Sequence, residues 1–267
     1  MYNIELEDRA ARIVEAAVKE AAVQLVDYVR SKLARGQDVD ARWLATTVNE
    51  LTRLNDEFAT AAVNRIARDF VQVAKASARE AVAQGRKDGM AASLDAIDEG
   101  LVRMALVNTK ILVKGILDKS VGTVASIVTN AIITRKPLDQ VAETIRQRVR
   151  VEDGDINVAR AVLIARSEIM SIYRQVQVGV GDQLGYQYYI YTGPKDYRTE
   201  KICLDALGVV TTLDEWRKVS DVVELYGLHY GCRHTLRPIK LFNPVEYQVT
   251  VGGVRIRAWK EGPGAKD

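Results

Sequence analysis

The first 136 residues contain no proline, and the first proline of the chain is Pro137. Proline breaks the interior of a helix, so a long stretch without it leaves room for long helices. Apolar residues in this stretch recur every three or four positions, which is the spacing of one face of an amphipathic helix. Two such stripes are Ile13, Ala17, Ala21, Leu25 and Val29, and then Phe58, Ala62, Ile66, Phe70 and Val73.

Helix breaks are predicted where glycine and polar residues interrupt this spacing. They fall at the segment ARGQDVDARW, near Gly85 and Gly89, around Gly100, and at TRKPLDQ. Helical spacing then continues to about residue 185. The sequence therefore predicts that the first 185 residues are almost wholly α-helical.

The pattern changes after Gly185. The segment YQYYIYTG is aromatic and favours a strand, and LDEWRKVSD favours a short helix capped by Thr212 or Asp214. Two alternating runs joined by Gly252 and Gly253 predict a β-hairpin. The last third of the chain should therefore fold as a small α+β module.

These patterns predict a mainly α protein with a long-helix N-terminal region and a small α+β C-terminal module. We divide the chain into a long-helical region for portal, capsid or self-association contacts (1–136), helices that lead into the module (137–185), the module (186–258) and a flexible tail (259–267). With 48% hydrophobic and 27% charged residues, the composition suits a globular protein.

Positive charge gathers in the middle of the chain. Residues 101–150 carry nine Lys and Arg residues against three acidic ones, a local charge of +6. One interpretation is a surface that contacts DNA, and the other is a solvated helix face or a contact with an acidic partner. The candidate residues are Arg103, Lys110, Lys114, Lys119, Arg135 and Lys136.

The N-terminus argues against export, and the least polar segment argues against a membrane span. The N-terminus is acidic where a secretory signal would be basic. The uncharged window Ser120–Thr134 is shorter than the roughly 20 apolar residues that a spanning helix needs. We therefore expect this window to be a buried or interface helix, with membrane contact as the minor alternative.

All cysteine and histidine residues of the chain lie in the predicted module. They are Cys203, His229, Cys232 and His234. Zinc accepts thiolate sulfur and imidazole nitrogen, and a structural zinc site fills four positions with protein groups. Three of these residues lie within six positions, so one tight loop could direct them to one point. The sequence therefore predicts a structural zinc site.

Two other interpretations of these residues stay open. The cysteines could pair in a disulfide, or they could be small buried hydrophobic residues beside hydrogen-bonded histidines. The spacing differs from the common arrangement of cysteine pairs two residues apart, so spacing alone does not choose among the three.

The order of several motifs resembles the head-morphogenesis, or Mu F-like, minor head proteins of tailed bacteriophages. Their pattern is an A-R-T-E helix, a strand, D-x-R-T, a His or Cys before an L-x-G turn, and C-R-C-x-L-x-P. The resemblance covers roughly residues 138–240. The matching residues are Ala165, Arg166 and Glu168, with Ser167 in place of threonine, then Asp196, Arg198, Thr199, Cys203 and Gly208, and finally His229, Cys232, Arg233, Leu236 and Pro238.

The resemblance implies a structural, non-enzymatic minor head protein. Such a protein joins the portal protein and the major capsid protein during head assembly and can contact packaged DNA. It would be made in the host cytoplasm and lie in the virion near the portal vertex. His234 stands where the family has the second cysteine of C-R-C, and this departure keeps a zinc ligand.

The D-x-R-T segment is expected to form a structural turn. Asp196 can accept backbone N–H groups, and Arg198 can pair with a carboxylate such as Glu168 or Asp196 itself. Thr199 belongs to the same turn, and Gly208 closes the turn that follows Cys203. We expect this turn to position Cys203 rather than to take part in catalysis.

Two further functions compete with the structural one. A metal-dependent hydrolase or nuclease would need an open metal position and a nearby acid or base. Neither an H-E-x-x-H helix nor the motif of zinc deaminases is present in the chain. A DNA-binding role is compatible with a head protein and predicts affinity that falls steeply with salt.

Overall fold

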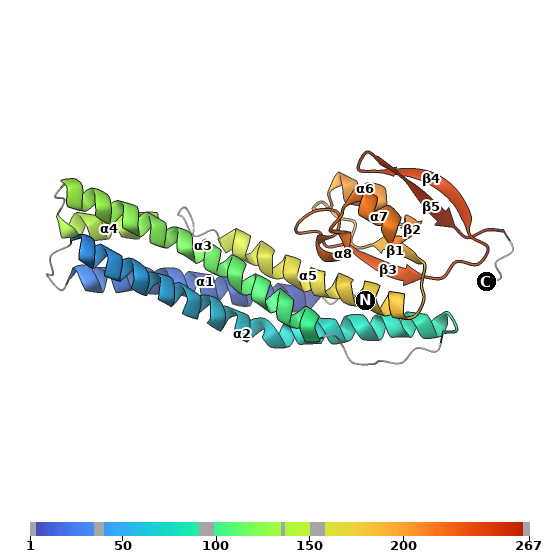
Figure 1. Ribbon diagram of the computed structural model, residues 1–267, viewed down its shortest axis with the longest axis horizontal. Coiled ribbons are helices and arrows are strands. Elements are labelled where there is room, and N and C mark those ends of the chain that lie inside the picture. Colours follow the sequence, from blue (N-terminus) through green and yellow to red (C-terminus); the bar gives the residue numbers. More distant parts are fainter. Residues whose placement is uncertain (1–3, 35–39, 91–98, 135–136, 150–157, 264–267) are drawn as a thin grey trace. The chain divides into compact units, whose positions relative to one another are not determined.

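The computed structural model describes residues 4–34, 40–90, 99–134, 137–149 and 158–263. Long helices precede a short strand-containing part, so the predicted mainly α fold class is confirmed (Figure 1). The helices before residue 185 are α1 (Ile4–Leu33), α2 (Ala41–Lys87), α3 (Glu99–Thr134), α4 (Leu138–Arg148) and α5 (Val158–Gln183).

The described helix ends follow the sequence signals. The helix α1 ends before ARGQDVDARW, α2 ends between Gly85 and Gly89, and α3 ends at TRKPLDQ. Gly89 has a φ of +74°, a left-handed conformation that favours glycine. The chain therefore leaves the helical conformation at the place where a side chain would oppose the turn.

The chain divides into two compact units that are not consecutive in sequence. We call them the helical unit, Asp8–Arg68 with Leu106–Ala165, and the mixed unit, Met1–Glu7 with Asp69–Ala105 and Arg166–Asp267. The boundaries between the units fall inside α1, α2, α3 and α5. The division expected from sequence instead cut the chain into consecutive segments at 136, 185 and 258. A change of composition along the sequence can only divide a chain into consecutive segments. The compact units depend instead on which parts of the helices pack together.

Aliphatic stripes form the core of the helical unit. The stripe predicted from Ile13 to Val29 is largely buried, as are matching residues of α2 and α3. Ion pairs link the helices at the rim, where Lys32 meets Glu50 at 2.9 Å and Lys110 meets Asp56 at 3.0 Å. The buried aliphatic residues include Val14, Ala21, Leu25, Val29, Leu51, Ala62, Val113, Leu117, Val124 and Val128.

The mixed unit contains a three-stranded antiparallel sheet in the order β2-β1-β3. The predicted strand YQYYIYTG is confirmed as β1 (Tyr188–Thr192), with β2 (Val210–Thr211) and β3 (Thr235–Ile239) beside it. Three short helices belong to the same unit as the sheet (Figure 1). They are α6 (Lys201–Ala206), α7 (Leu213–Val219) and α8 (Val223–Tyr226).

The hairpin predicted around Gly252 and Gly253 is also confirmed. It consists of β4 (Val245–Val251) and β5 (Val254–Lys260), and both glycines have positive φ. Thr212 caps α7 by accepting the Glu215 N–H, as one of the two predicted caps. The tail predicted from residue 259 begins too early, because Trp259 and Lys260 still pair with β4.

The carboxylate of Glu215 joins α7 to the hairpin. Its side chain is 2% exposed, and it accepts hydrogen bonds from the backbone N–H and the Nε of Arg257 at 3.1 and 2.9 Å. Lys218 donates to the same carboxylate at 2.6 Å. A buried carboxylate held by two cations fixes the hairpin against the rest of the unit.

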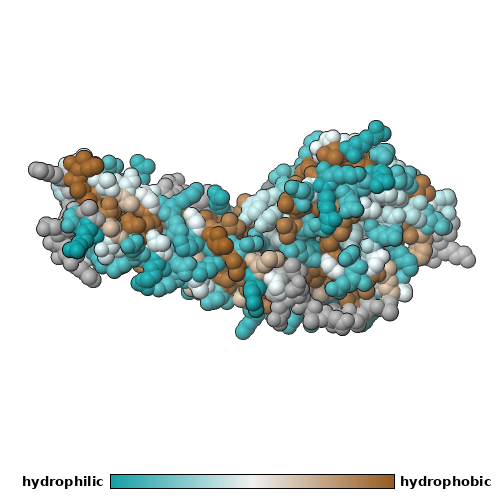
Figure 2. Space-filling view, viewed as in Figure 1, coloured by the Kyte–Doolittle hydropathy of each residue, from teal (hydrophilic) through white to brown (hydrophobic). Residues whose placement is uncertain are grey.

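The uncharged window of α3 is a partly buried helix, as predicted. Ser120, Val121, Val124 and Val128 are buried, whereas Ile133 is exposed. Figure 2 shows separate hydrophobic areas on a visible face that is mainly hydrophilic. Among the described residues, no helix has the length and apolar character that a membrane crossing requires.

Candidate metal centre

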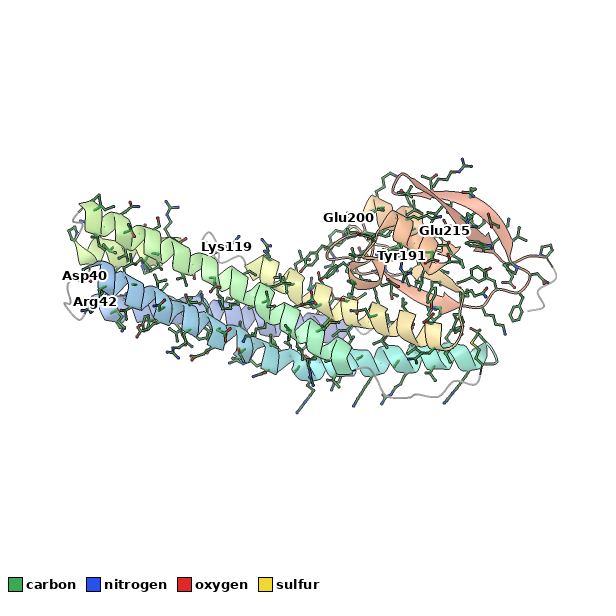
Figure 3. All side chains as sticks on the ribbon, viewed as in Figure 1. Asp40, Arg42, Lys119, Tyr191, Glu200 and Glu215 are labelled. Carbon is green, nitrogen blue, oxygen red and sulfur yellow. The ribbon has the colours of Figure 1, made fainter. Side chains whose placement is uncertain are left out.

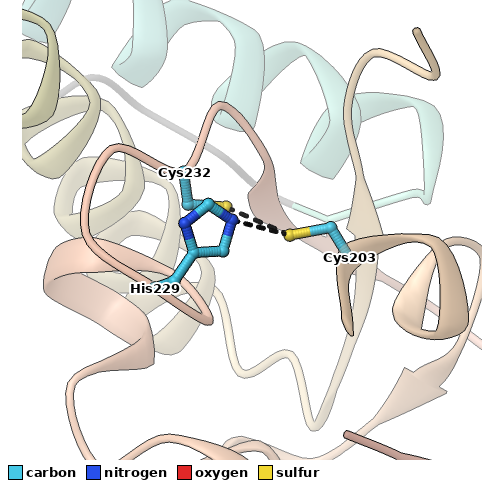
Figure 4. A group of neighbouring side chains, drawn as sticks. All are labelled: Cys203, His229 and Cys232. Atoms are coloured by element: carbon cyan, nitrogen blue, oxygen red, sulfur yellow. Dashed lines mark hydrogen bonds between the residues drawn. The ribbon is translucent and has the colours of Figure 1, made fainter. Parts of the chain in front are cut away.

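Three of the four predicted ligands converge inside the mixed unit. The ligand atoms of Cys203, His229 and Cys232 all lie within 4.8 Å of one another (Figure 4). The two Sγ atoms are 3.6 Å apart, and Cys203 Sγ lies 3.2 Å from His229 Nε2. Both cysteines are free, so the two thiols are not joined in a disulfide. This cluster could hold a metal ion.

Local structure explains why Cys203 meets His229 and Cys232, which follow it by 26 and 29 positions. Cys203 lies in α6, which begins directly after the D-x-R-T turn, and the other residues lie in the loop between α8 and β3. We call residues 229–234 the ligand loop. Gly227 precedes the loop with a φ of +71°, and a Cβ there would lie 2.9 Å from Cys232 Sγ. Only glycine lets the backbone turn this close to the cysteine.

His234 lies at the edge of this group rather than in it. Its Nδ1 is 3.6 Å from Cys232 Sγ, but it does not belong to the set whose ligand atoms are all within 4.8 Å. Its ring stacks on Tyr191 at a centroid distance of 5.3 Å. The structure therefore brings together three of the predicted ligands and places the fourth in contact with one of them.

Backbone carbonyls orient both imidazole rings. A carbonyl oxygen only accepts hydrogen bonds, so His229 Nδ1 donates to the Tyr230 carbonyl at 3.0 Å and His234 Nε2 donates to the Pro194 carbonyl at 2.9 Å. The remaining nitrogen of each ring, Nε2 of His229 and Nδ1 of His234, faces a cysteine sulfur. Metal-binding histidines characteristically have this arrangement.

Tyr191 is a component of the site that the sequence reasoning missed. Its hydroxyl lies 3.3 Å from Cys203 Sγ and 3.0 Å from Cys232 Sγ, and its side chain is buried. Burial, together with the two neighbouring sulfurs, raises the pKa of the Tyr191 hydroxyl. The hydroxyl therefore keeps its proton and can donate it to a sulfur. Its alternating position within β1 was the available sequence signal, because Tyr189 and Tyr191 share the buried face.

Arg174 is the second missed component. It comes from α5, is 1% exposed, and donates to the carbonyls of His234 at 2.6 Å and Leu225 at 2.9 Å, and also to the carbonyl of Cys232. Its position four residues from both Met170 and Val178 puts it on a buried helical face, which was the signal in the sequence. The guanidinium fixes the backbone of the ligand loop.

The two thiols differ in their affinity for a proton. The hydrogen bond with Cys203, the rings of His229 and His234 and the charge of Arg174 together lower the pKa of Cys232 against the effect of burial. The hydrogen bond with Cys232 and burial raise the pKa of Cys203. Cys232 is therefore the thiolate of the pair, and thiolate is the form that binds metals.

The D-x-R-T segment forms the predicted turn, with one different partner. Asp196 accepts the backbone N–H of Arg198 at 2.9 Å, and Thr199 Oγ1 donates to the Pro194 carbonyl at 3.1 Å. Asp196 forms a two-point ion pair with Arg233, at 2.8 and 2.5 Å. The expected pairing of Arg198 with Asp196 or Glu168 is wrong, because the Arg198 guanidinium lies over the Tyr197 ring instead.

The turn is linked to both sides of the cluster. The Pro194 carbonyl accepts from Thr199 and from His234, and α6 with Cys203 starts two residues after Thr199. The hydrogen bond from Arg233 is the main reason that the pKa of Asp196 lies well below its usual range. Gly208, with a φ of +79°, closes the following turn by donating to the Tyr191 carbonyl at 2.9 Å.

The predicted DNA-contact residues are only partly available for phosphates. Lys110 pairs with Asp56 at 3.0 Å and Lys114 with Asp118 at 2.5 Å, so carboxylates already neutralise both ammonium groups. Arg103 and Lys119 are exposed. Arg135 and Lys136 lie outside the described residues.

We compared the chain with known proteins and found no match. The chain matches no protein-family model, no curated protein and no solved structure.

Proposed function

We propose that this chain is a structural minor head protein of a tailed bacteriophage, and that a zinc ion stabilises its C-terminal module. The observation that carries the proposal is the cluster of Cys203, His229 and Cys232, built by motifs that are far apart in sequence. The D-x-R-T turn and the C-R-H segment meet through Asp196 and Arg233. The ordered motif resemblance supports the assignment to phage heads.

The separations in the cluster suit zinc. Bonds of about 2.3 Å to sulfur and about 2.0 Å to nitrogen place tetrahedral ligands about 3.8 Å (S–S) and about 3.5 Å (S–N) apart. The Sγ atoms lie 3.6 Å apart, and Cys232 Sγ lies 3.6 Å from His234 Nδ1. In this proposal His234 is the fourth ligand, and its Nδ1 has to move closer to the other ligands than it lies in the structure. Together with His229, it makes a closed set of two thiolates and two imidazoles.

Burial favours a structural role over the competing hydrolase or nuclease. Cys203 and Cys232 are 0% and 2% exposed, and Tyr191 and His234 pack against them. A catalytic zinc keeps one position open to water and substrate. In the proposed role the ion instead stabilises a module that is too small to be stable by hydrophobic burial alone.

Metal content tests the zinc site directly. Protein purified under reducing conditions should contain one zinc per chain by elemental mass spectrometry, and Cys232→Ala should lose it. Thr212→Ala is the matched control, because it removes the α7 cap at a cost of about 1 kcal/mol without touching a ligand. Metal-free wild-type protein, or zinc loss in the control alone, would contradict the site.

The head assignment needs a separate experiment. Heads isolated from the phage that encodes this chain should contain it at low copy number, and cryo-electron microscopy should locate it at the portal vertex. Copies of the chain could also contact one another there. Absence of the chain from mature heads and from assembly intermediates would refute the assignment without affecting the zinc site.

A further inference from the structure

The hairpin of β4 and β5 has one covered edge and one open edge. At the β5 edge, the N–H of Arg257 donates to the carboxylate of Glu215 at 3.1 Å, and the carbonyl of Arg257 accepts from Thr211 at 2.5 Å. Figure 3 labels Glu215, which comes from α7 and reaches this edge of the hairpin. On its other side, β4 has no neighbouring strand among the described residues (Figure 1). We call this side of β4 the open edge.

The contacts of Arg257 show which backbone groups of β4 point to the open edge. Arg257 lies opposite Gln248, and both of its backbone groups bind residues outside the hairpin, so the two residues do not hydrogen-bond to each other. In such a pair, both residues direct their N–H and C=O groups away from the partner strand. The alternation of an antiparallel pair gives Glu246 and Thr250 the same direction. Within the described part of the chain, the outward groups of these three β4 residues have no hydrogen-bond partner.

The open edge is accessible and lacks the features that protect edge strands. Residues 245–248 and Thr250 are exposed. The helix α6 contacts β4 near the turn, where Ile202 reaches Gly252, but Thr250 stays exposed beside this contact. Lysine, proline or a bulge within an edge strand usually prevents pairing with another chain. Val245–Val251 contains neither lysine nor proline, and its register with β5 has no bulge.

We propose that the open edge pairs in antiparallel direction with the open edge of a second copy of this chain, so that two hairpins form one four-stranded sheet. The strand β4 is self-complementary about a two-fold axis at Gln248. Gln248 then faces Gln248 of the second copy, and Glu246 faces Thr250 of the second copy. In this register every outward N–H meets an outward carbonyl, and no carboxylate lies opposite a like charge. The inference is independent of the metal site, of the head assignment and of the self-association expected for the long helices.

Exposed apolar side chains favour a second copy as the occupant. Val245 and Tyr247 are 41% and 37% exposed, although they share a face of β4 with the buried Val251. In the proposed register, Tyr247 lies beside Val249 of the second copy, and Val245 lies beside Val251 of the second copy. Pairs of aromatic and β-branched residues stabilise neighbouring strands. A two-stranded hairpin is also only marginally stable by itself, so the added strands stabilise both copies.

Sedimentation equilibrium of the full chain tests the proposal with two substitutions that add the same charge. The wild type should show a reversible monomer–dimer equilibrium between about 5 and about 200 μM. Gln248→Lys puts two lysines opposite each other and should raise the dissociation constant of the dimer by about 3-fold or more. Thr250→Lys puts a lysine opposite Glu246 of the second copy, twice per dimer, and should lower this constant by about 3-fold or more. Within one hairpin the two positions are matched, because each faces an arginine of β5, Arg257 or Arg255.

A cysteine on the proposed axis tests the register. Gln248→Cys should form a disulfide between two copies when oxygen and copper phenanthroline oxidise the thiols, because the facing Cα atoms would be about 5.5 Å apart. Arg255→Cys, exposed on β5, should give only the background of the wild type with its buried Cys203 and Cys232. Circular dichroism should confirm that all variants fold.

Three outcomes would overturn the proposal. A wild type that stays monomeric up to about 200 μM would leave the open edge to an extended segment of another protein. Equal dissociation constants in the two lysine variants would put any dimer contact on another surface. Equal crosslinking of the two cysteine variants would show that collisions, rather than a fixed register, bring the thiols together.

Discussion

Arg174 Nε donates to the main-chain carbonyl of His234 at 2.6 Å, and this contact connects α5 to the ligand loop. The same guanidinium also donates to the carbonyls of Leu225 and Cys232. No described carboxylate shares it. A fully buried cation that donates to two carbonyls of the ligand loop and to one of α8 acts as a positioning group for the residues on that loop.

Replacing Arg174 should therefore loosen metal binding as well as destabilise the fold. Arg174→Lys keeps the charge, but one ammonium group cannot match the planar arrangement of the guanidinium. We expect a loss of about 3 kcal/mol in the free energy of unfolding, at about 1 kcal/mol per carbonyl left without its donor. Chelator competition should show zinc affinity lowered by about 10- to 100-fold.

The exposed arginine at the start of α5 gives the control for this change. Arg160→Lys should leave both stability and zinc affinity close to those of the wild type. If Arg174→Lys lowered stability while its zinc affinity equalled that of the control, the role of Arg174 would be confined to packing.

Periodic patterns predicted the fold well because they report local preferences. The stripe from Ile13 to Val29, the hairpin turn at Gly252 and Gly253 and the Thr212 cap each depend on residues close in sequence. The compact units were not predictable in this way. They are formed by parts of α1, α2, α3 and α5, and nothing in a helical stripe says which neighbour its residues meet.

The three residues of the cluster were predicted from the sequence, whereas the residues that hold them in place were not. The four Cys and His residues were selected because the chain has no others, they lie in one module and they are residue types that bind zinc. Tyr191 and Arg174 are chemically ordinary members of a strand and a helix, and only the tertiary fold brings them to the sulfurs. Arg233, rather than Arg198, pairs with Asp196 for the same reason.

Gly193 should be sensitive to a single added methyl group. A Cβ at this position would lie 2.5 Å from Cδ2 of His234, much closer than carbon atoms approach. Gly193→Ala should displace the ring from the Pro194 carbonyl, destabilise the protein by about 1–3 kcal/mol and weaken zinc binding. Thermal denaturation with and without chelator measures both effects.

Gly179→Ala is the matched control for this substitution. It lies in α5 with no atom within 4 Å of the added carbon, and alanine favours a helix by up to about 1 kcal/mol over glycine. This variant should be as stable as the wild type or more stable. An equally mild effect at Gly193 would show that the His234 ring has another position available.

Removal of the Tyr191 hydroxyl should affect the metal more than the packing. Tyr191→Phe keeps the ring against Trp216 and His234 but removes the donor that faces both sulfurs. We expect zinc affinity to fall about 10-fold or more and stability to fall by about 1 kcal/mol. Tyr226→Phe, which removes a longer hydrogen bond to Glu168 at 3.5 Å, should change zinc affinity little. Equal zinc affinities in the two variants would refute a role for the Tyr191 hydroxyl.

Glu215 should make the stability of the protein depend on acidic pH. Burial alone would raise the pKa of this carboxyl, but hydrogen bonds from Lys218 and Arg257 lower it to about 2. Because the pKa is lower in the folded state than in the unfolded one, the contribution to stability is present above about pH 4.5 and is lost as pH falls towards 2. The difference between the two states corresponds to about 3 kcal/mol.

Comparison of wild-type protein with Glu215→Gln isolates this contribution. Other carboxyl groups, and any acid release of metal, should affect both proteins equally. The wild type should be more stable by about 3 kcal/mol near pH 6, and the difference should shrink as pH falls from 5 to 2 in urea unfolding experiments. A difference that stays constant over this range would mean that Glu215 does not titrate in the folded protein as its contacts require.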